Sequence, residues 1–194
     1  LLFVADSNRV SATPNNHRVL IYRNLSSFVP GLRDELPQGR RCPVCVGEAD
    51  VQLANSNFKA VNGPSSSNLR LPTGVASDGR ILVVADTDNN RVLIWNQIPS
   101  QDSVPANVVL GQADFTTNTV NFGTGDPRVP NASSMKGPQG VWIQDGRLFV
   151  ADTGNSRVLS WNQVPTANNT PANLVIGQSA FDRAVVSSLL DPGL

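Results

Sequence analysis

Residues 84–97 read VADTDNNRVLIWNQ and residues 150–163 read VADTGNSRVLSWNQ, so one stretch occurs twice, with its second copy 66 positions after the first. A third copy opens the chain. Val4-Ala5-Asp6-Ser7-Asn8 supplies its first half and, after about seven extra residues, His17-Arg18-Val19-Leu20-Ile21-Tyr22 supplies its second. In each copy two apolar runs flank a short polar turn. Self-similarity at a fixed period predicts a repeat architecture.

Two further blocks recur in the same order around this stretch. Residues 105–115 match 171–181 through a Pro-Ala-Asn start and a Gly-Gln-x-x-Phe end, and residues 42–50 match them more loosely. Residues 72–80 match 138–147 through Pro-x-Gly-Val and Asp-Gly-Arg. The chain is therefore expected to be one propeller-like region of three units, each of roughly sixty-six residues. These units are about 1–71 (incomplete at its start), 72–137 and 138–194.

Each unit is expected to form four short strands. The runs are rich in Val, Ile and Leu, and no sustained helical period lies between them. Asp78-Gly79 tolerates positive φ and suits a two-residue hairpin between the first two strands. The sequence thus predicts an all-β fold. The expected strands are 74–77, 81–85, 91–95 and 107–111 in the second unit, and 140–144, 148–152, 157–161 and 173–177 in the third.

Four-stranded units in radial repetition are the layout of a β-propeller, which protects sheet edges by packing blade against blade. A linear array of sheets is the alternative, but twisted antiparallel sheets stack more naturally into a ring. Propellers have about 4–8 blades, so three cannot close one. The chain is expected to be either a piece of a longer protein or half of a six-bladed ring. We favour a homodimer of three plus three blades, because pairing covers the open ends of the array.

The quoted residues resemble the NHL repeat. They share its Pro-x-Gly-Val-Ala-x-Asp-Gly opening, its Val-Ala-Asp-Thr strand end, and its Asn-x-Arg-Val before an aromatic residue. The resemblance implies a β-propeller, often six-bladed, used mostly as a recognition surface for protein or RNA. A few relatives with similar repeats are enzymes, such as a zinc-dependent amidating lyase. The departure is the longer period, whose excess lies in 48–71 and 112–138.

Composition disfavours several classes of function. Fifteen Lys and Arg balance fifteen Asp and Glu, and only 15 % of the 194 residues are charged. Nucleic-acid binding is therefore disfavoured, because neutralising phosphates needs a basic excess. No apolar run approaches the ~20 residues that span a bilayer. The Asn-rich, Lys-poor composition is typical of an exported bacterial protein, so a secreted or periplasmic location is expected.

The Asp and Arg residues on either side of the repeated turn form a recurring set. We expect each Asp to accept hydrogen bonds and pair with its own Arg, which pins the hairpin. The alternative is a ring of paired charges that presents a ligand surface. A feature present in every blade favours the structural interpretation, since a binding site needs differences between blades. The residues are Asp6, Asp86, Asp152, Arg18, Arg91 and Arg157.

Residues suited to metal or nucleophilic chemistry are scarce. Cys42 and Cys45 form a lone CxxC that aligns with Ala106 and Val109 on a fourth strand. Two thiols filling core positions are the favoured interpretation, and a disulfide at the start of the strand is the alternative. His17, the only histidine, is placed in the inserted turn of the first unit, and a zinc site needs several such ligands. No catalytic residue, cofactor or metal ligand is therefore expected.

The favoured function is a non-catalytic recognition scaffold that binds a protein, peptide or glycan. Its loops on one face, chiefly 23–41 and 112–138, are the expected contact surface, with Arg33, Arg40 and Arg41 as the most blade-specific charges. The alternatives are a propeller enzyme of the lyase or hydrolase kind with a metal in the central channel, and RNA binding. Three aromatic residues at one third-strand position are expected to pack between blades. They are Tyr22, Trp95 and Trp161.

Overall fold

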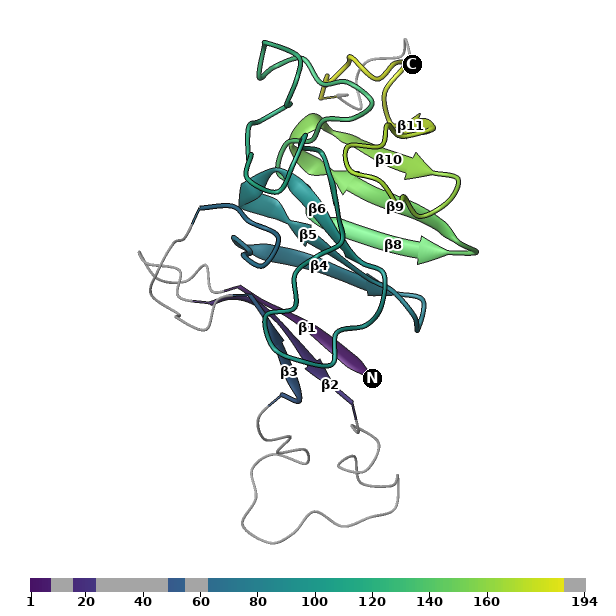
Figure 1. Ribbon diagram of the computed structural model, residues 1–194. Coiled ribbons are helices and arrows are strands. Elements are labelled where there is room, and N and C mark those ends of the chain that lie inside the picture. The colour runs from purple at the N-terminus through teal and green to yellow at the C-terminus, as the bar shows by residue number, and fades with distance from the viewer. Residues whose placement is uncertain (8–15, 24–48, 55–62, 187–194) are drawn as a thin grey trace, which may run out of the picture.

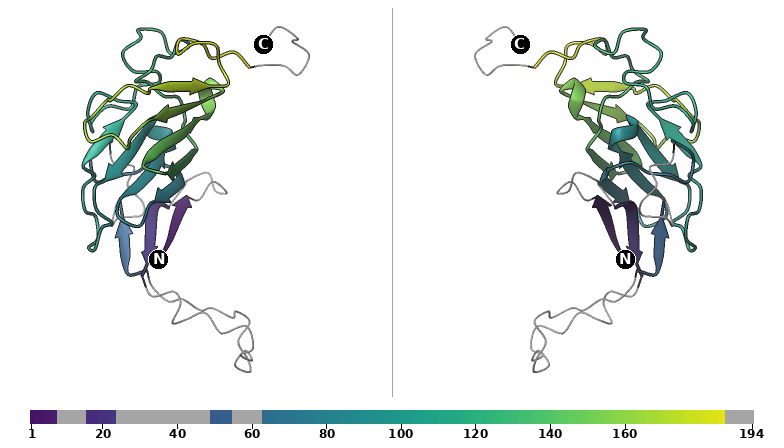
Figure 2. Two further views of the ribbon diagram at one scale, coloured as in Figure 1. Left: turned by 90° about the vertical axis from the view of Figure 1, so that its right-hand side faces the viewer. Right: turned by 90° about the vertical axis from the view of Figure 1, so that its left-hand side faces the viewer.

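The computed structural model describes residues 1–7, 16–23, 49–54 and 63–186. It contains three antiparallel sheets, which lie one beside the next along the molecule (Figure 1) and curve together in the perpendicular views (Figure 2). The first sheet has the order β1 (Leu2–Ser7), β2 (His17–Tyr22), β3 (Val51–Leu53). The second is β4 (Pro72–Ser77), β5 (Leu82–Asp86), β6 (Arg91–Trp95), β7 (Val108–Leu110). The third is β8 (Gly140–Gln144), β9 (Arg147–Asp152), β10 (Arg157–Trp161), β11 (Leu174–Ile176).

The all-β prediction is confirmed, and each sheet is a blade of a partial β-propeller. Among the described residues the helical elements are two single 3₁₀ turns, η2 (Thr87–Asn89) and η3 (Thr153–Asn155). Each follows the Asp of the repeated turn and ends at a residue with φ of 52°, Asn90 in one blade and Ser156 in the other. The second and third blades therefore repeat each other down to the backbone conformation of this turn.

The fourth strand of the first blade lies later in the chain than the sequence alignment placed it. The strand is β3, in which Leu53 pairs with Val19 as Leu110 pairs with Val92 in the second blade. The predicted match of residues 42–50 to this strand is therefore wrong. Ala54 stands where Gly111 lies, and both have positive φ, 76° and 89°. Because residue 54 is alanine and not glycine, the sequence around β3 does not resemble the Gly-Gln-x-x-Phe block of the other two units.

Two hydrophobic cores lie between neighbouring blades, because alternate residues of a strand point to opposite faces of its sheet. The first core joins the first and second blades and contains Trp95; the second joins the second and third blades and contains Trp161. The prediction that these tryptophans pack between blades is confirmed. We call the face of a blade that meets the preceding blade its backward face, and the face that meets the next blade its forward face. In the second blade, Leu82 and Val84 lie on the backward face and Ile81 and Val83 on the forward face.

Gly74 lies where the first strands of neighbouring blades come closest. A Cβ atom added there would meet the carbonyl oxygen of Gln139 at 2.5 Å and the Cα atom of Gly140 at 3.2 Å. Both are backbone atoms, so the blades would have to move apart. We therefore expect Gly74→Ala to lower the free energy of unfolding by about 1–3 kcal/mol, measured by urea denaturation. Gly140→Ala is the matched control, because its nearest contact is the Cβ atom of Ala151 at 3.4 Å, and an equal loss in both variants would contradict the explanation.

The strands run between two ends of the molecule. The turn end carries the Asp86–Arg91 and Asp152–Arg157 turns and segment 111–139, and the hairpin end carries the connections 77–82 and 144–147, to the right in Figure 1.

The two loops expected to share one face leave the blades at opposite ends. Segment 23–41 follows β2 at the hairpin end, where Tyr22 pairs with the first residue of β1, Leu2. Segment 112–138 follows β7 at the turn end, where Leu110 pairs with Val92. A segment after a third strand and one after a fourth strand leave an antiparallel sheet at opposite ends. Residues 24–41 lie outside the described residues, so the shared face of the two loops stays a prediction.

Candidate functional site

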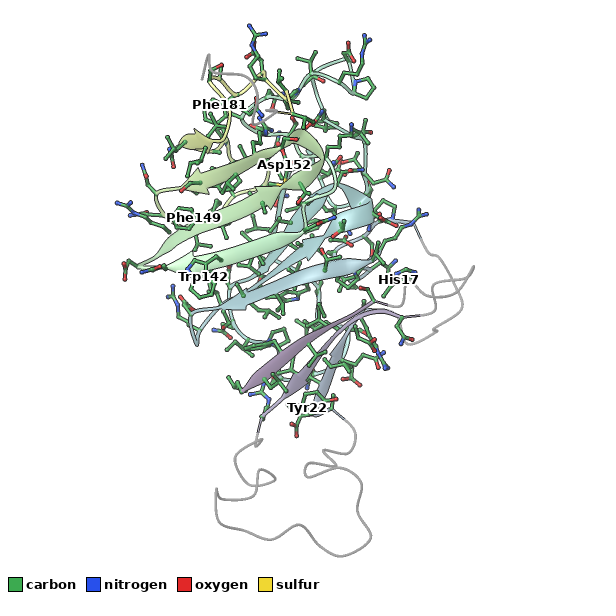
Figure 3. All side chains as sticks on the ribbon, turned by 180° about the vertical axis from the view of Figure 1, so that it is seen from behind. His17, Tyr22, Trp142, Phe149, Asp152 and Phe181 are labelled. Carbon is green, nitrogen blue, oxygen red and sulfur yellow. The ribbon has the colours of Figure 1, made fainter. Side chains whose placement is uncertain are left out.

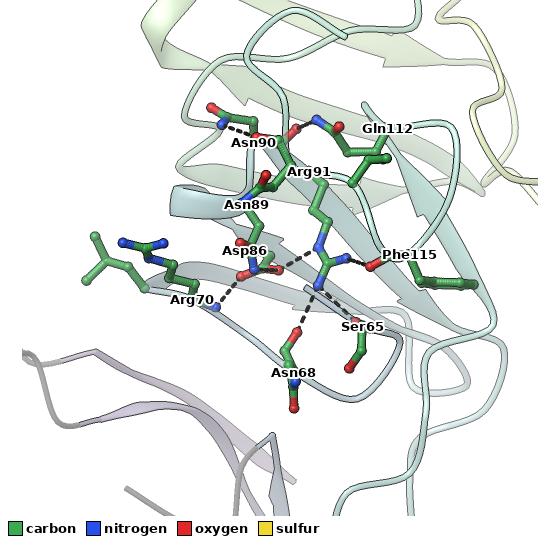
Figure 4. A network of polar contacts seen from close by, with 12 residues as sticks. Ser65, Asn68, Arg70, Asp86, Asn89, Asn90, Arg91, Gln112 and Phe115 are labelled. Atoms are coloured by element: carbon green, nitrogen blue, oxygen red, sulfur yellow. Dashed lines mark hydrogen bonds and ion pairs between the residues drawn. The ribbon is translucent and has the colours of Figure 1, made fainter. Parts of the chain in front are cut away.

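The carboxylate of Asp86 is held at the turn end by three donors (Figure 4). Its Oδ2 atom accepts hydrogen bonds from Nε of Arg91 at 2.7 Å and from Nδ2 of Asn89 at 2.8 Å. Its Oδ1 atom accepts the backbone N–H of Arg70 at 2.5 Å. Both side chains of the ion pair are fully buried. Burial raises the pKa of Asp86, against the opposing effects of the Arg91 charge and these donors.

The guanidinium of Arg91 uses its other nitrogens to hold two linkers. It donates to the carbonyl oxygens of Ser65 and Asn68, both at 2.9 Å, in the linker that precedes the second blade. It also donates to the carbonyl oxygen of Phe115 at 2.6 Å, in the linker that follows. The arginine guanidinium is planar and carries five N–H donors, so one side chain can bind several carbonyl oxygens and a carboxylate at once. The ion pair thus joins the turn to the segments on both sides of its own blade.

The third blade repeats this network. Asp152 accepts from Arg157 at 2.8 Å, from Asn155 at 2.7 Å and from the backbone N–H of Lys136 at 2.8 Å, and burial raises the pKa of its carboxyl. Arg157 donates to the carbonyl oxygens of Asn131, Ser134 and Phe181.

In the first blade the same two positions form a more exposed ion pair. Nε of Arg18 donates to Oδ2 of Asp6 at 2.6 Å, and about a fifth of each side chain is exposed. The structure therefore brings all six repeated Asp and Arg residues into pairs within their own blades. These pairs point inward, toward linker backbone, in the second and third blades.

Hydrogen bonds at the turn end also tie neighbouring blades together. Oδ1 of Asn90 accepts the backbone N–H of Gly137 at 2.9 Å, and Nδ1 of His17 accepts that of Leu71 at 2.8 Å. His17 therefore lies in β2 at the position equivalent to Asn90, and its predicted placement in the inserted turn is wrong. Gln112 acts within the second unit: its amide joins the linker after β7 to the turn of the same blade, since it binds the carbonyl of Asn90 and both backbone groups of Thr119. The buried Asp and Arg side chains of this end are therefore bound to the scaffold itself.

Three hollows open at the hairpin end. A cavity of about 340 Å³ opens between the innermost described strands of the three blades. Its most exposed large side chain is Trp142 of β8, which is 62 % exposed and is labelled with Phe149 in Figure 3. Two further hollows open at the same end, of about 390 Å³ beside segment 95–107 and about 460 Å³ around residues 144–149. The lining of the first cavity includes Leu2, Phe3, Val75, Ala76, Trp142 and Ile143.

Residues 69–95, which span β4 to β6 and the Asp86–Arg91 network, match the family model of the NHL repeat. The chain contains an NHL repeat. NHL repeats indicate a β-propeller domain used for protein interaction. Among curated proteins, none matches the chain.

The NHL turn accounts for residues that the sequence comparison left without a role. Asn89 and Asn155 follow their Asp by three positions and bind its Oδ2 atom, and the Gly-Gln-x-x-Phe block supplies Gln112 and the Phe115 carbonyl. These residues recur in the repeats, but their side chains are not of the catalytic or metal-binding types that a search for sites considers first. Trp142 was also missed, and its signal is a difference between repeats, since Ala76 occupies the equivalent NHL position.

Several expected site residues fall outside the described part of the chain. Arg33, Arg40 and Arg41, the expected partner contacts, and Cys42 and Cys45 all lie within 24–48. Within the described residues, no group of three or more His, Cys, Asp or Glu side chains is arranged to hold a metal ion. The same residues include no helix long and apolar enough to cross a membrane.

Proposed function

We propose that this chain is a recognition module that binds an extended segment of a partner protein at its hairpin end, with the hollow around Trp142 as the anchor. The observation that carries the proposal is the apolar hollow that β1, β4 and β8 of the three blades line together at the hairpin end. At the turn end the buried charges are bound to the scaffold, whereas three hollows open at the hairpin end. Binding sites are usually concave and lined mainly by apolar side chains, as this hollow is.

Trp142 is the residue on which this binding depends. Tryptophan is enriched among the few side chains that supply most of the energy of protein interfaces. In the second blade Ala76 fills the equivalent position, so folding of a blade does not require a large side chain there. The apolar walls of the hollow, including Phe3 and Val75, suit an aliphatic or aromatic anchor of a partner. Recognition rather than catalysis also agrees with the use of the repeated Asp and Arg side chains within the scaffold.

Selection of peptides from a random displayed library against the purified chain tests this function. We expect enriched sequences that share an apolar anchor, and Trp142→Ala should weaken their binding at least about 30-fold. Val129→Ala is the control, because Val129 is an exposed apolar residue of the linker at the turn end. The proposal is overturned if no peptide is enriched, or if Trp142→Ala binds the enriched peptides as tightly as the wild type.

A further inference from the structure

Two polar ties cross the junction between the first and second blades, and each has a counterpart between the second and third. In the first junction, Nδ1 of His17 accepts the backbone N–H of Leu71 at 2.8 Å (His17 is labelled in Figure 3). In the second junction, Oδ1 of Asn90 accepts the backbone N–H of Gly137 at 2.9 Å. The two junctions therefore differ at this tie in the acceptor, which is an imidazole in one and an amide in the other.

The second tie lies at the outer strand of the first blade, β3. Oδ1 of Asp102 accepts the backbone N–H of Gln52 at 2.8 Å, and the N–H of Ser103 donates to the carbonyl oxygen of Gln52 at 2.9 Å. In the second junction, Oδ1 of Asn168 accepts the N–H of Val109 at 3.0 Å. Here too the first junction has a titratable acceptor where the second has an amide.

The backbone at Leu71 is strained, and this strain is confined to the first junction. Leu71 has a φ of 54°, and its counterpart Gly137 has nearly the same value, 53°. Glycine adopts this left-handed conformation readily, whereas a side chain makes it unfavourable. The hydrogen bond to His17 helps to hold Leu71 in place, so loss of that bond lets the segment before β4 relax.

We propose that acid opens the junction between the first and second blades by protonating His17, while the junction between the second and third blades stays closed. Histidine ordinarily gains its charge between about pH 8 and pH 5. Because Nδ1 of His17 accepts a hydrogen bond, the neutral ring carries its proton on Nε2. A second proton goes to Nδ1, where it faces the N–H of Leu71, so that one donor meets another. The tie is therefore present at neutral pH and is lost as the pH falls, whereas the amide of Asn90 remains an acceptor throughout.

The charged side chains on the elements packed around His17 also disfavour a further positive charge. Each described carboxylate among them already binds an arginine, so protonation of His17 adds a cation to a set of groups whose negative charges are already balanced. The ion pairs are Asp6 with Arg18 in the first blade, and Asp86 with Arg91 and Asp88 with Arg70 in the second.

Hydrogen exchange at single backbone amides, followed by NMR from about pH 7.5 to about pH 5, tests this switch. After correction for the intrinsic pH dependence of exchange, the N–H groups of Leu71 and Ser103 should both become at least about tenfold less protected at the lower pH. Their counterparts in the second junction are the N–H groups of Gly137 and Asn169, the latter donating to the carbonyl oxygen of Val109 at 2.8 Å. These should change less than about threefold. A joint loss at Leu71 and Ser103 reports opening of the whole junction, because the two amides belong to different ties.

Two variants assign the effect to His17. His17→Asn gives the first junction the acceptor type of the second, so Leu71 and Ser103 should keep their protection over the whole pH range. Asp102→Asn is the matched control: aspartate ordinarily gains its proton at about pH 4, so this variant should lose protection as the wild type does.

The wild type alone can overturn the proposal. It does so if both amides of the first junction stay protected, if only Leu71 loses protection, or if the amides of the second junction lose as much. The proposal is also overturned if His17→Asn responds to acid as the wild type does, or if Asp102→Asn abolishes the response.

Discussion

Arg91→Ala is expected to lower the free energy of unfolding by about 3–5 kcal/mol, because it leaves the buried carboxylate of Asp86 without its opposite charge. Burial already raises the pKa of Asp86, and Arg91 supplies the largest opposing effect. The variant also leaves the carbonyl oxygens of Ser65, Asn68 and Phe115 without their donor. Urea denaturation followed by circular dichroism at one protein concentration measures the loss.

Two further variants separate the explanation from a general sensitivity to losing arginine. Arg128→Ala breaks an ion pair with Asp126 in which the Arg128 side chain is 86 % exposed, and it should leave the free energy of unfolding unchanged within error. Arg91→Lys retains a charge but not the planar fork, so it should fall between the wild type and Arg91→Ala. Equal stabilities of Arg91→Ala and Arg128→Ala would show that the buried network does not hold the blade.

The strands of the second and third blades could be predicted because their periodicity and turns agree. The predicted strands 91–95, 140–144 and 157–161 coincide with β6, β8 and β10. In the first blade the prediction of the fourth strand was wrong. Ala54, which follows that strand, adopts the positive φ that Gly111 and Gly177 adopt in the other blades. Glycine is the usual residue for that conformation, so its absence removed the strongest marker of the repeat.

The candidate site was harder to predict than the fold. The pairing of Asp86 with Arg91 follows from their positions on adjacent strands. The remaining hydrogen-bond donors of Arg91 bind backbone carbonyls of the linkers, and no pattern of side chains in the sequence indicates such partners. The sequence comparison also favoured residues that recur. Trp142 is exposed at the hairpin end and stands where the second blade has Ala76, so a search for recurring residues passes over it.

Trp161→Ala is expected to lower the free energy of unfolding by about 3–5 kcal/mol, as large-to-small changes of buried aromatic residues do. Trp161 is 1 % exposed and lies in the core between the second and third blades. Its Nε1 atom donates to the carbonyl oxygen of Thr170 at 3.0 Å, so the variant also leaves a partly buried acceptor without this partner. Urea denaturation at the same protein concentration measures this change.

Trp95→Ala tests whether the repeated position has a repeated energetic role. Trp95 fills the matching place between the first and second blades and donates to the carbonyl oxygen of Val104 at 2.8 Å. Stability in repeat proteins is approximately a sum of terms from each unit and each neighbouring interface, so the two losses should be similar. Trp142→Ala, in contrast, should leave the free energy of unfolding nearly unchanged, because its side chain is largely exposed. A large loss for Trp142→Ala would place that residue in the scaffold and remove the argument for a binding surface around it.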